Sequence, residues 1–255
     1  MVLFMFSLEI ECNPEDRDRF IADLWEMGSV GIVELSQERL RAFFEDSADR
    51  TELLRRFPHA AVQREEARDW VQSARDLFPP MEVGKRFYLV PEWRDDPAPP
   101  GRFRIKVNPG MAFGTGVHES TRLCIEALED VLRPGMHLLD VGTGSGILAK
   151  AASLLGAGRV YACDIDPVAV AIAGIGFVGS VDAAASSCAD VVTANISPEV
   201  IVAAAPDLFR VLRPNGVLLA SGFEVHEIAQ MKSALGDASE VRTKGNWALI
   251  AVRRS

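Results

Sequence analysis

The sequence has few of the side chains that bind metals or form disulfides. Its 255 residues include only four cysteines and four histidines. The cysteines, at positions 12, 124, 163 and 188, form no Cys-x-x-Cys pair, so we predict no metal site. Cys163 lies in an apolar run and is expected to be buried. This usage favours reduced thiols in a cytoplasmic protein.

The chain has no excess of positive charge. Its 27 Lys and Arg residues face 36 Asp and Glu, a formal charge of -9. Proteins that coat nucleic acid need a basic surface, so no direct nucleic-acid binding is expected. Residues 1–100 alone hold 21 acidic and 13 basic residues. This acidic excess is either a solvated face or a docking surface for a basic partner.

Long apolar runs are also missing. The N-terminal MVLFMFSLEIEC lacks the basic region and cleavage site of a signal peptide, and its apolar stretch is too short to span a bilayer. No internal repeat is found. Hydrophobic residues still make up 48% of the chain, enough for a sizeable core. We therefore expect a cytoplasmic, monomeric protein with no membrane association.

The first hundred residues are predicted to be a small α+β domain and a connection. The apolar patterns predict strands at 3–11, 31–35, 40–45 and 60–64, with helices starting near 13–15 and covering 47–57. This order predicts a ferredoxin-like domain over 1–64. A helix at 65–77 and a strand at 86–90 would follow. Four prolines within 91–101 predict a stiff linker that completes a connection over 65–101.

Residues 102–255 alternate between strand and helix patterns. The expected strands are 103–107, 137–141, 159–164, 189–194, 215–221 and 247–252, and the expected helices are 119–132, 146–155, 166–173, 198–211 and 225–235. Near-continuous apolar strands in repeated βα units predict a parallel sheet covered on both faces, a doubly wound Rossmann-like α/β domain. Segments 238–243 and 247–252 follow each other without a helix, which predicts an antiparallel hairpin.

A glycine-rich loop lies between an apolar strand and a helix, in Leu138-Leu139-Asp140-Val141-Gly142-Thr143-Gly144-Ser145-Gly146. Its glycines allow a tight turn and close approach of a ligand, and the helix N-terminus offers unpaired N–H groups. A second acid, Asp164, ends the next strand 22 residues after Gly142, a spacing typical of a ribose-binding carboxylate. The following Asp166-Pro167 pair resembles an N-cap and a first-turn proline, so we assign Asp166 to structure.

The loop favours S-adenosylmethionine (SAM) over a dinucleotide. A dinucleotide fingerprint reads G-x-G-x-x-G, whereas this loop reads G-x-G-x-G. Asp140 suits the ammonium group of SAM and would sit awkwardly beside a pyrophosphate. A merely tight strand-to-helix joint is the remaining alternative, and Asp140 together with Asp164 argues against it.

Two further segments carry a family resemblance. They are Asn108-Pro109-Gly110-Met111-Ala112-Phe113-Gly114-Thr115-Gly116-Val117-His118-Glu119-Ser120-Thr121 and Val192-Thr193-Ala194-Asn195-Ile196. Together with the glycine loop they resemble the ribosomal protein L11 methyltransferase family. That resemblance implies a class I SAM-dependent methyltransferase that modifies lysine side chains and the N-terminal amine of ribosomal protein L11. It also implies that the N-terminal domain recognises this substrate.

The resemblance also implies cofactor contacts for individual residues, namely Phe113, Thr121, Gly142, Asp164 and Asn195. The glycine loop itself adds Asp140, Thr143 and Gly144 to the expected cofactor-binding residues. Asn195 would in addition orient the incoming amine, as the one candidate catalytic residue. His118 is expected to shape the loop or cap the following helix, with catalysis as the lesser alternative.

One feature departs from the family. Asp164 and Asn195 are 31 residues apart, which is shorter than usual, so the adenine contacts can only be assigned to the group Ser180, Val181 and Asp182. The short segment leaves open SAM binding without catalysis, and the divergent N-terminal region leaves open methylation of another protein or a small molecule. Nicotinamide-dependent oxidoreduction is a third rival, disfavoured by the glycine loop.

Overall fold

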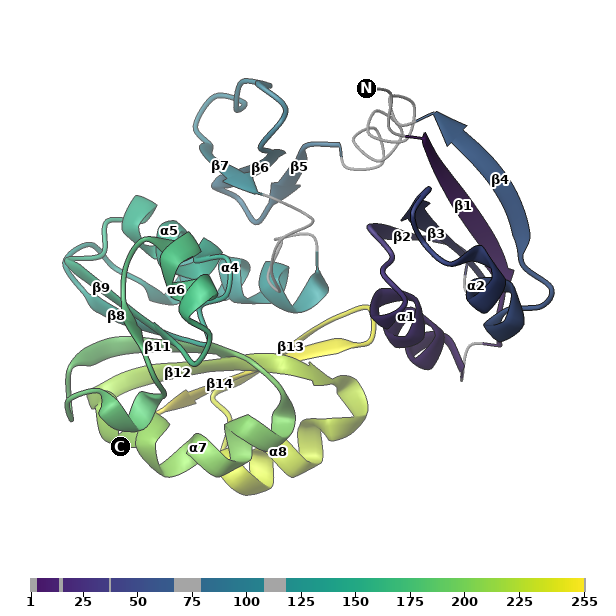
Figure 1. Ribbon diagram of the computed structural model, residues 1–255. Helices are drawn as coiled ribbons and strands as arrows, with labels where there is room; N and C mark the ends of the chain where they lie inside the picture. The colour runs from purple at the N-terminus through teal and green to yellow at the C-terminus, as the bar shows by residue number, and fades with distance from the viewer. Residues whose placement is uncertain (1–3, 14–15, 37, 67–78, 108–117, 255) are drawn as a thin grey trace. The chain divides into compact units, whose positions relative to one another are not determined.

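The computed structural model describes residues 4–13, 16–36, 38–66, 79–107 and 118–254. The chain forms two compact units, Met1–Phe78 and Pro79–Ser255, and each is described by itself (Figure 1).

The described part of the N-terminal unit is a four-stranded antiparallel sheet with two helices. Its elements are β1 (Phe4–Glu11), α1 (Arg17–Glu26), β2 (Gly31–Ser36), β3 (Arg39–Glu45), α2 (Arg50–Arg56) and β4 (Ala61–Glu66). The strand order is β2-β3-β1-β4, so β1 pairs with both β3 and β4, and β2 and β4 form the edges. The order of elements and this pairing confirm the predicted ferredoxin-like α+β fold.

The period-two pattern of β1 explains the core of this unit. Phe6, Leu8 and Ile10 point to one face of the sheet and are at most 3% exposed. Leu24 of α1 and Leu53 of α2 join the same core cluster. Asp49 begins α2 because its side chain accepts hydrogen bonds from the backbone N–H groups of Thr51 and Glu52.

The larger unit contains a seven-stranded sheet. Its strands are β8 (His137–Val141), β9 (Arg159–Asp164), β10 (Phe177–Val178), β11 (Ala189–Asn195), β12 (Leu212–Glu224), β13 (Glu240–Lys244) and β14 (Trp247–Arg253). The order is β10-β9-β8-β11-β12-β14-β13. All pairings from β10 to β12 are parallel, and β14 is antiparallel to β12 and β13. The predicted parallel sheet with a C-terminal antiparallel hairpin is confirmed.

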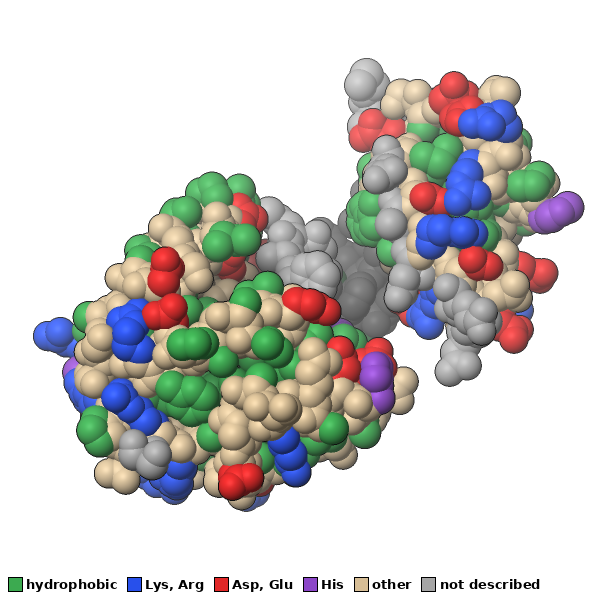
Figure 2. All heavy atoms as spheres, turned by 90° about the horizontal axis from the view of Figure 1, so that it is seen from below, with side chains coloured by type: hydrophobic (Ala, Val, Ile, Leu, Met, Phe, Trp, Pro, Cys, Tyr) green, Lys and Arg blue, Asp and Glu red, His purple; other side chains and the backbone are tan. Residues whose placement is uncertain are grey.

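Helices cover both faces of this sheet. They are α4 (Glu119–Val131), α5 (Ile147–Leu154), α6 (Pro167–Ala173), α7 (Pro198–Val211) and α8 (Ile228–Leu235). Figure 1 shows α4, α5 and α6 on one face and α7 and α8 on the other, and Figure 2 views the molecule from the side of α7 and α8. Neighbouring residues of β8 pack into opposite cores, Leu138 with α4 and α5 and Leu139 with α7 and α8. The unit is therefore doubly wound, as predicted.

A separate three-stranded sheet corrects part of the prediction. It contains β5 (Met81–Val83), β6 (Phe87–Pro91) and β7 (Phe103–Val107), in the order β5-β6-β7. Segment 103–107 was expected to begin the large parallel sheet. It pairs instead in parallel with β6, because Phe87 and Ile105 bury their side chains together with those of α4.

The proline-rich segment is also placed differently from the prediction. It connects β6 to β7, and Lys106 and Arg104 on β7 form ion pairs with Asp95 in this connection. Residues 91–101 therefore lie inside the larger unit and do not link the two units. The division falls between Phe78 and Pro79, in place of the boundaries at 64/65 and 101/102. The helix expected at 65–77 lies, from residue 67 onward, outside the described residues.

Candidate functional site

The order of the parallel strands creates a crevice for a ligand. From β8 the chain runs outward through β9 to β10, and from β11 it runs the other way to β12. The direction reverses between β8 and β11, whose register places Asp140 opposite Thr193. Ligands of open α/β sheets bind outside the carboxyl ends of the strands at such a switch point. The glycine loop follows β8 there, and Asn195 ends β11.

The glycine loop is held by backbone bonds to β9. The N–H groups of Gly142 and Thr143 both donate to the Cys163 carbonyl, at 2.9 and 3.1 Å. Gly142 has a φ of 69°, and a Cβ there would lie 2.2 Å from Cγ2 of Ile196. A side chain at this position would therefore collide with the residue after Asn195, so glycine is required by both conformation and packing.

Asp140 is buried beneath the loop. Its side chain accepts hydrogen bonds from the hydroxyls of Thr143, at 2.7 Å, and Thr193, at 2.6 Å. Burial raises the pKa of Asp140, and these two hydrogen bonds act against that rise. The carboxyl group thus joins the loop to β11. Contact with the SAM ammonium group stays a prediction for Asp140.

Thr193 was missed by the sequence analysis. It is the one hydroxyl of strand β11, fully buried between Val192 and Ala194, and its partner Asp140 is 53 residues earlier. A lone polar residue in a buried strand requires a hydrogen-bond partner, and that requirement is the signal that could have identified it.

Asp164 lies at the carboxyl end of β9 and is only partly buried. Its carboxylate accepts the Gly144 N–H at 2.9 Å through one oxygen and the Asp166 N–H at 3.0 Å through the other. Asp166 caps α6, since its side chain accepts the Val168 N–H and Pro167 occupies the first turn. The structural assignment of Asp166 is confirmed, and ribose binding by Asp164 stays a prediction.

Ile165, between these two acids, is a second residue that the sequence analysis missed. Its side chain is 79% exposed, the highest value among the large apolar residues described. It stands beside Asp164 at the carboxyl edge of the sheet. An exposed aliphatic side chain next to a ribose-binding carboxylate can contact the flat face of a base.

Thr121 and Asn195 meet although they are 74 residues apart. The Asn195 side-chain amide donates to the Thr121 hydroxyl at 3.2 Å, and Thr121 is only 1% exposed. Thr121 lies in the first turn of α4 and Asn195 at the end of β11, so the contact joins this helix to the carboxyl end of the strand. The structure thus brings together two residues that the sequence assigned to the same site.

His118 caps α4, as expected. Its Nδ1 lies 2.7 Å from the Ser120 hydroxyl and accepts the Ser120 N–H at 3.4 Å. The ring packs edge-to-face against Trp247, with 4.3 Å between centroids. Partial burial lowers the pKa of His118 below its ordinary value. Phe113, the predicted aromatic cover of the cofactor, lies outside the described residues.

The short segment after α6 narrows the adenine candidates. The Gly179 N–H donates to the Asp164 carbonyl at 2.8 Å, so the chain returns alongside β9. Arg210 of α7 donates to the carbonyls of Val181 and Asp182 at 3.2 and 3.1 Å. The Val181 side chain is 1% exposed and belongs to the core. Of the predicted adenine contacts, the side chains of Ser180 and Asp182 remain candidates.

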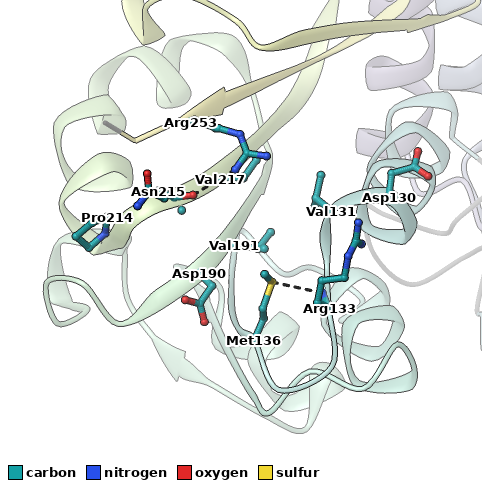
Figure 3. Close-up of a pocket in the computed structure, with 11 residues that line it drawn as sticks. Asp130, Val131, Arg133, Met136, Asp190, Val191, Pro214, Asn215, Val217 and Arg253 are labelled. Atoms are coloured by element: carbon teal, nitrogen blue, oxygen red, sulfur yellow. Dashed lines mark hydrogen bonds between the residues drawn. The ribbon is translucent and has the colours of Figure 1, made fainter.

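A cavity elsewhere in the larger unit is separate from this crevice. It has a volume of about 370 Å³ and lies at the amino ends of β8 and β11, the opposite edge of the sheet (Figure 3). Its lining includes Asp130, Arg133, Asp190, Asn215 and Arg253. None of the predicted site residues that the structure describes lines it.

The residues of the crevice fit SAM. Neither 138–149 nor 160–178 contains a lysine or arginine that would neutralise a pyrophosphate. The residues around the switch point include the carboxylate of Asp164, the exposed side chain of Ile165 and the amide of Asn195, which is bonded to the buried Thr121. This donor set suits a ribose, a base and a cationic sulfonium. Among the described residues, no group of His, Cys, Asp and Glu side chains could hold a metal ion.

Comparisons with known proteins identify the family. The family model of ribosomal protein L11 methyltransferase (PrmA) matches residues 42–255. The ribosomal protein L11 methyltransferase of Desulfitobacterium hafniense is 36% identical over 222 residues, covering 79% of this chain and 71% of that protein. That of Caldicellulosiruptor saccharolyticus is 31% identical over 306 aligned positions, covering 98% of this chain and 99% of that protein.

A solved structure agrees as well. The ribosomal protein L11 methylase of Lactobacillus delbrueckii subsp. bulgaricus matches with a TM-score of 0.64 and 29% identity, covering 70% of this chain and 100% of that chain. The 306 aligned positions of the full-length relative exceed the 255 residues here, so that relative has segments that this chain lacks. A family match over most of the sequence and the site geometry lead to one conclusion: this chain belongs to the ribosomal protein L11 methyltransferase family, whose members are SAM-dependent methyltransferases.

Proposed function

We propose that this protein transfers methyl groups from SAM to amines of ribosomal protein L11, at lysine side chains and at the N-terminal amine. The observation that carries the proposal is the Thr121–Asn195 hydrogen bond beside the glycine loop. It sets an amide side chain at the switch point of the sheet, where a methyl donor and an amine would meet. Family membership supplies the substrate class.

The chain's residues divide the work of binding. Asp164 would accept hydrogen bonds from the ribose hydroxyls, and Ile165 would lie against the adenine. The Asp140 carboxyl, held by two threonine hydroxyls, would keep the loop next to β11. SAM supplies an electrophilic methyl group on a cationic sulfonium. Asn195, held by its hydrogen bond to the buried Thr121, would then orient the amine in line with that group, so that positioning provides much of the rate.

The amine must be neutral to react. For a lysine of ordinary pKa, about 10.4, deprotonation near pH 7.4 costs about 4 kcal/mol of free energy. Desolvation in the crevice lowers an amine pKa, and a neighbouring sulfonium charge acts in the same direction. His118 is the histidine nearest to Thr121 in the sequence. Its Nδ1 is engaged in hydrogen bonds with Ser120. We therefore propose catalysis without a dedicated general base.

Label transfer tests the function. The full chain is incubated with methyl-labelled SAM and a ribosomal protein extract, and the labelled species is identified. We expect label in L11, formation of S-adenosylhomocysteine, and a much lower turnover for Asn195→Ala with retained SAM binding. Label in a different species would refute the substrate assignment. Full turnover by Asn195→Ala would refute the orienting role.

A further inference from the structure

The two edges of the N-terminal sheet differ in how they are protected. Edge strands present unpaired backbone N–H and C=O groups, and proteins usually block them with charged side chains. The sequence of β4 ends in three charged residues, Arg64, Glu65 and Glu66. The sequence of β2 is GIVELS, and its one charge, Glu34, is taken up in an ion pair with Arg17. Among the described residues, no strand pairs with the outer edge of β2.

Apolar side chains accompany the open edge. Leu35 of β2 is 43% exposed, and Val30, directly before the strand, is 39% exposed. Ile32 and Val33 between them are half-buried. An added strand would find both free backbone groups and apolar side chains to cover.

An acidic cavity lies where β2 ends. It has a volume of about 510 Å³, and its lining comes from the end of β1, the start of α1 and the turn between β2 and β3: Glu11, Cys12, Asn13, Asp16, Phe20, Ser36, Glu38 and Arg39. Arg39 pairs with Glu9, and Asp16 pairs with Arg19. Glu11 and Glu38 form no ion pair within the part of the chain that is described. Two carboxylates of the cavity are thus available to a cation.

The charge of the whole unit selects the partner. Residues 1–78 contain seventeen acidic and ten basic residues, a net charge of -7, whereas the rest of the chain carries only -2. Figure 2 shows acidic and basic side chains interspersed on the visible face of this unit, so the excess is one of total charge. A basic polypeptide is attracted to such a surface, and an acidic protein or a nucleic acid is repelled.

We propose that β2 and the cavity at its end form the docking surface for an extended basic segment of the protein substrate. The segment's backbone would add a strand to β2, apolar side chains would cover Val30 and Leu35, and a Lys or Arg would enter the cavity between Glu11 and Glu38. This inference rests on the proposed function, since it names the part of this chain that holds the methylated protein.

Steady-state methylation of L11 by the full chain tests the surface. Leu35→Lys places a positive charge on the outer edge of β2, where it would repel a basic segment. We therefore expect KM for L11 to rise about tenfold, with kcat and SAM affinity unchanged. Val62→Lys is the matched control, because Val62 is also 43% exposed and lies on the opposite edge strand β4. That variant should keep the wild-type KM. Thermal unfolding of both variants checks that they fold.

A second variant isolates the cavity. Glu11→Gln combined with Glu38→Gln should raise KM and make it less sensitive to salt than in the wild type. Equal KM values for Leu35→Lys and Val62→Lys, with the wild type active on L11, would overturn the docking surface and leave the proposed function intact. A wild-type chain that neither binds nor methylates L11 would overturn both.

Discussion

Asp164 and Asp166 differ in role although they are two residues apart. Asp164 holds the Gly144 N–H and faces the crevice, whereas Asp166 holds the Val168 N–H at the start of α6. We expect Asp164→Ala to weaken SAM binding by about 2 kcal/mol, the value of hydrogen bonds to a charged group. Asp166→Ala should keep SAM affinity and lower the unfolding free energy by about 1 kcal/mol through loss of the cap. Titration calorimetry measures the SAM affinity and urea unfolding the stability. Weaker SAM binding in Asp166→Ala but not in Asp164→Ala would contradict this assignment of roles.

His118 makes stability depend on pH. Its pKa is lowered in the folded state, so the unfolded chain binds the proton more readily. The stabilisation is present above the ordinary histidine pKa of about 6.5 and is lost as the pH falls through that value toward the lower folded pKa. His118→Asn keeps a capping side chain that does not titrate. We expect the wild type to lose more stability than this variant between pH 7.5 and pH 5, as measured by urea midpoints. Parallel losses would contradict the account.

The residues that the sequence identified were found in two ways. Asp164 was found from its place at a strand end after the glycine loop, whereas Thr121 and Asn195 were found from motifs that resemble the family. Thr193 was not identified, because its partner Asp140 is 53 residues away in the sequence. Ile165 was not identified, because it is distinguished only by the exposure of its side chain in the fold. Neither property can be read from local spacing.

At the scale of elements, one carboxylate joins the small sheet to α4. Glu129 accepts the backbone N–H groups of Lys85 and Arg86 at 2.8 and 2.7 Å. Its side chain fills the space next to Gly84, where a Cβ would lie 2.5 Å from Oε2. These contacts hold the turn between β5 and β6 against the helix that carries Thr121.

Replacement of Glu129 tests this joint. Glu129→Ala leaves two N–H groups without their acceptor, and we expect the unfolding free energy to fall by roughly 1–2 kcal/mol. Asp130→Ala is the control, because it removes only ion pairs with Lys85 and Arg242 and should change stability by less than about 0.5 kcal/mol. Equal effects in urea unfolding would show that the backbone contacts contribute nothing specific.

The sequence predicted the elements better than their partners. Most strands and helices were placed within a few residues, because apolar periodicity and caps such as Asp166 are local signals. Strand 103–107 was assigned to the wrong sheet, and the proline-rich segment to a linker. Both errors concern which strands pair, and pairing between β6 and β7 is decided by shared burial with Leu123 and Leu128 of α4.

For the whole molecule, the boundary between units predicts where the chain can be cut. Phe87 and Leu89 of β6 belong to the core of the larger unit, so residues 79–90 are part of it. Deletion of residues 1–78 should leave a folded fragment that binds SAM but no longer methylates L11 efficiently. Deletion of residues 1–90 removes β5 and most of β6, and should lower the melting temperature strongly.

Thermal unfolding with and without SAM compares the two fragments. Equal melting temperatures would show that β5 and β6 are dispensable for the core. Undiminished methylation of L11 by the 79–255 fragment would contradict a recruiting role for the N-terminal unit.

Across the described residues of both units, no helix is long and apolar enough to cross a membrane.

The central claim is methyl transfer to amines of ribosomal protein L11, and intact-mass spectrometry of L11 tests it most directly. After incubation with the full chain and SAM, we predict that L11 gains mass in steps of one methylene each, located by fragmentation at lysine or N-terminal amines. Samples without SAM should show no gain. An unchanged L11 mass under conditions in which the chain binds SAM would contradict the account.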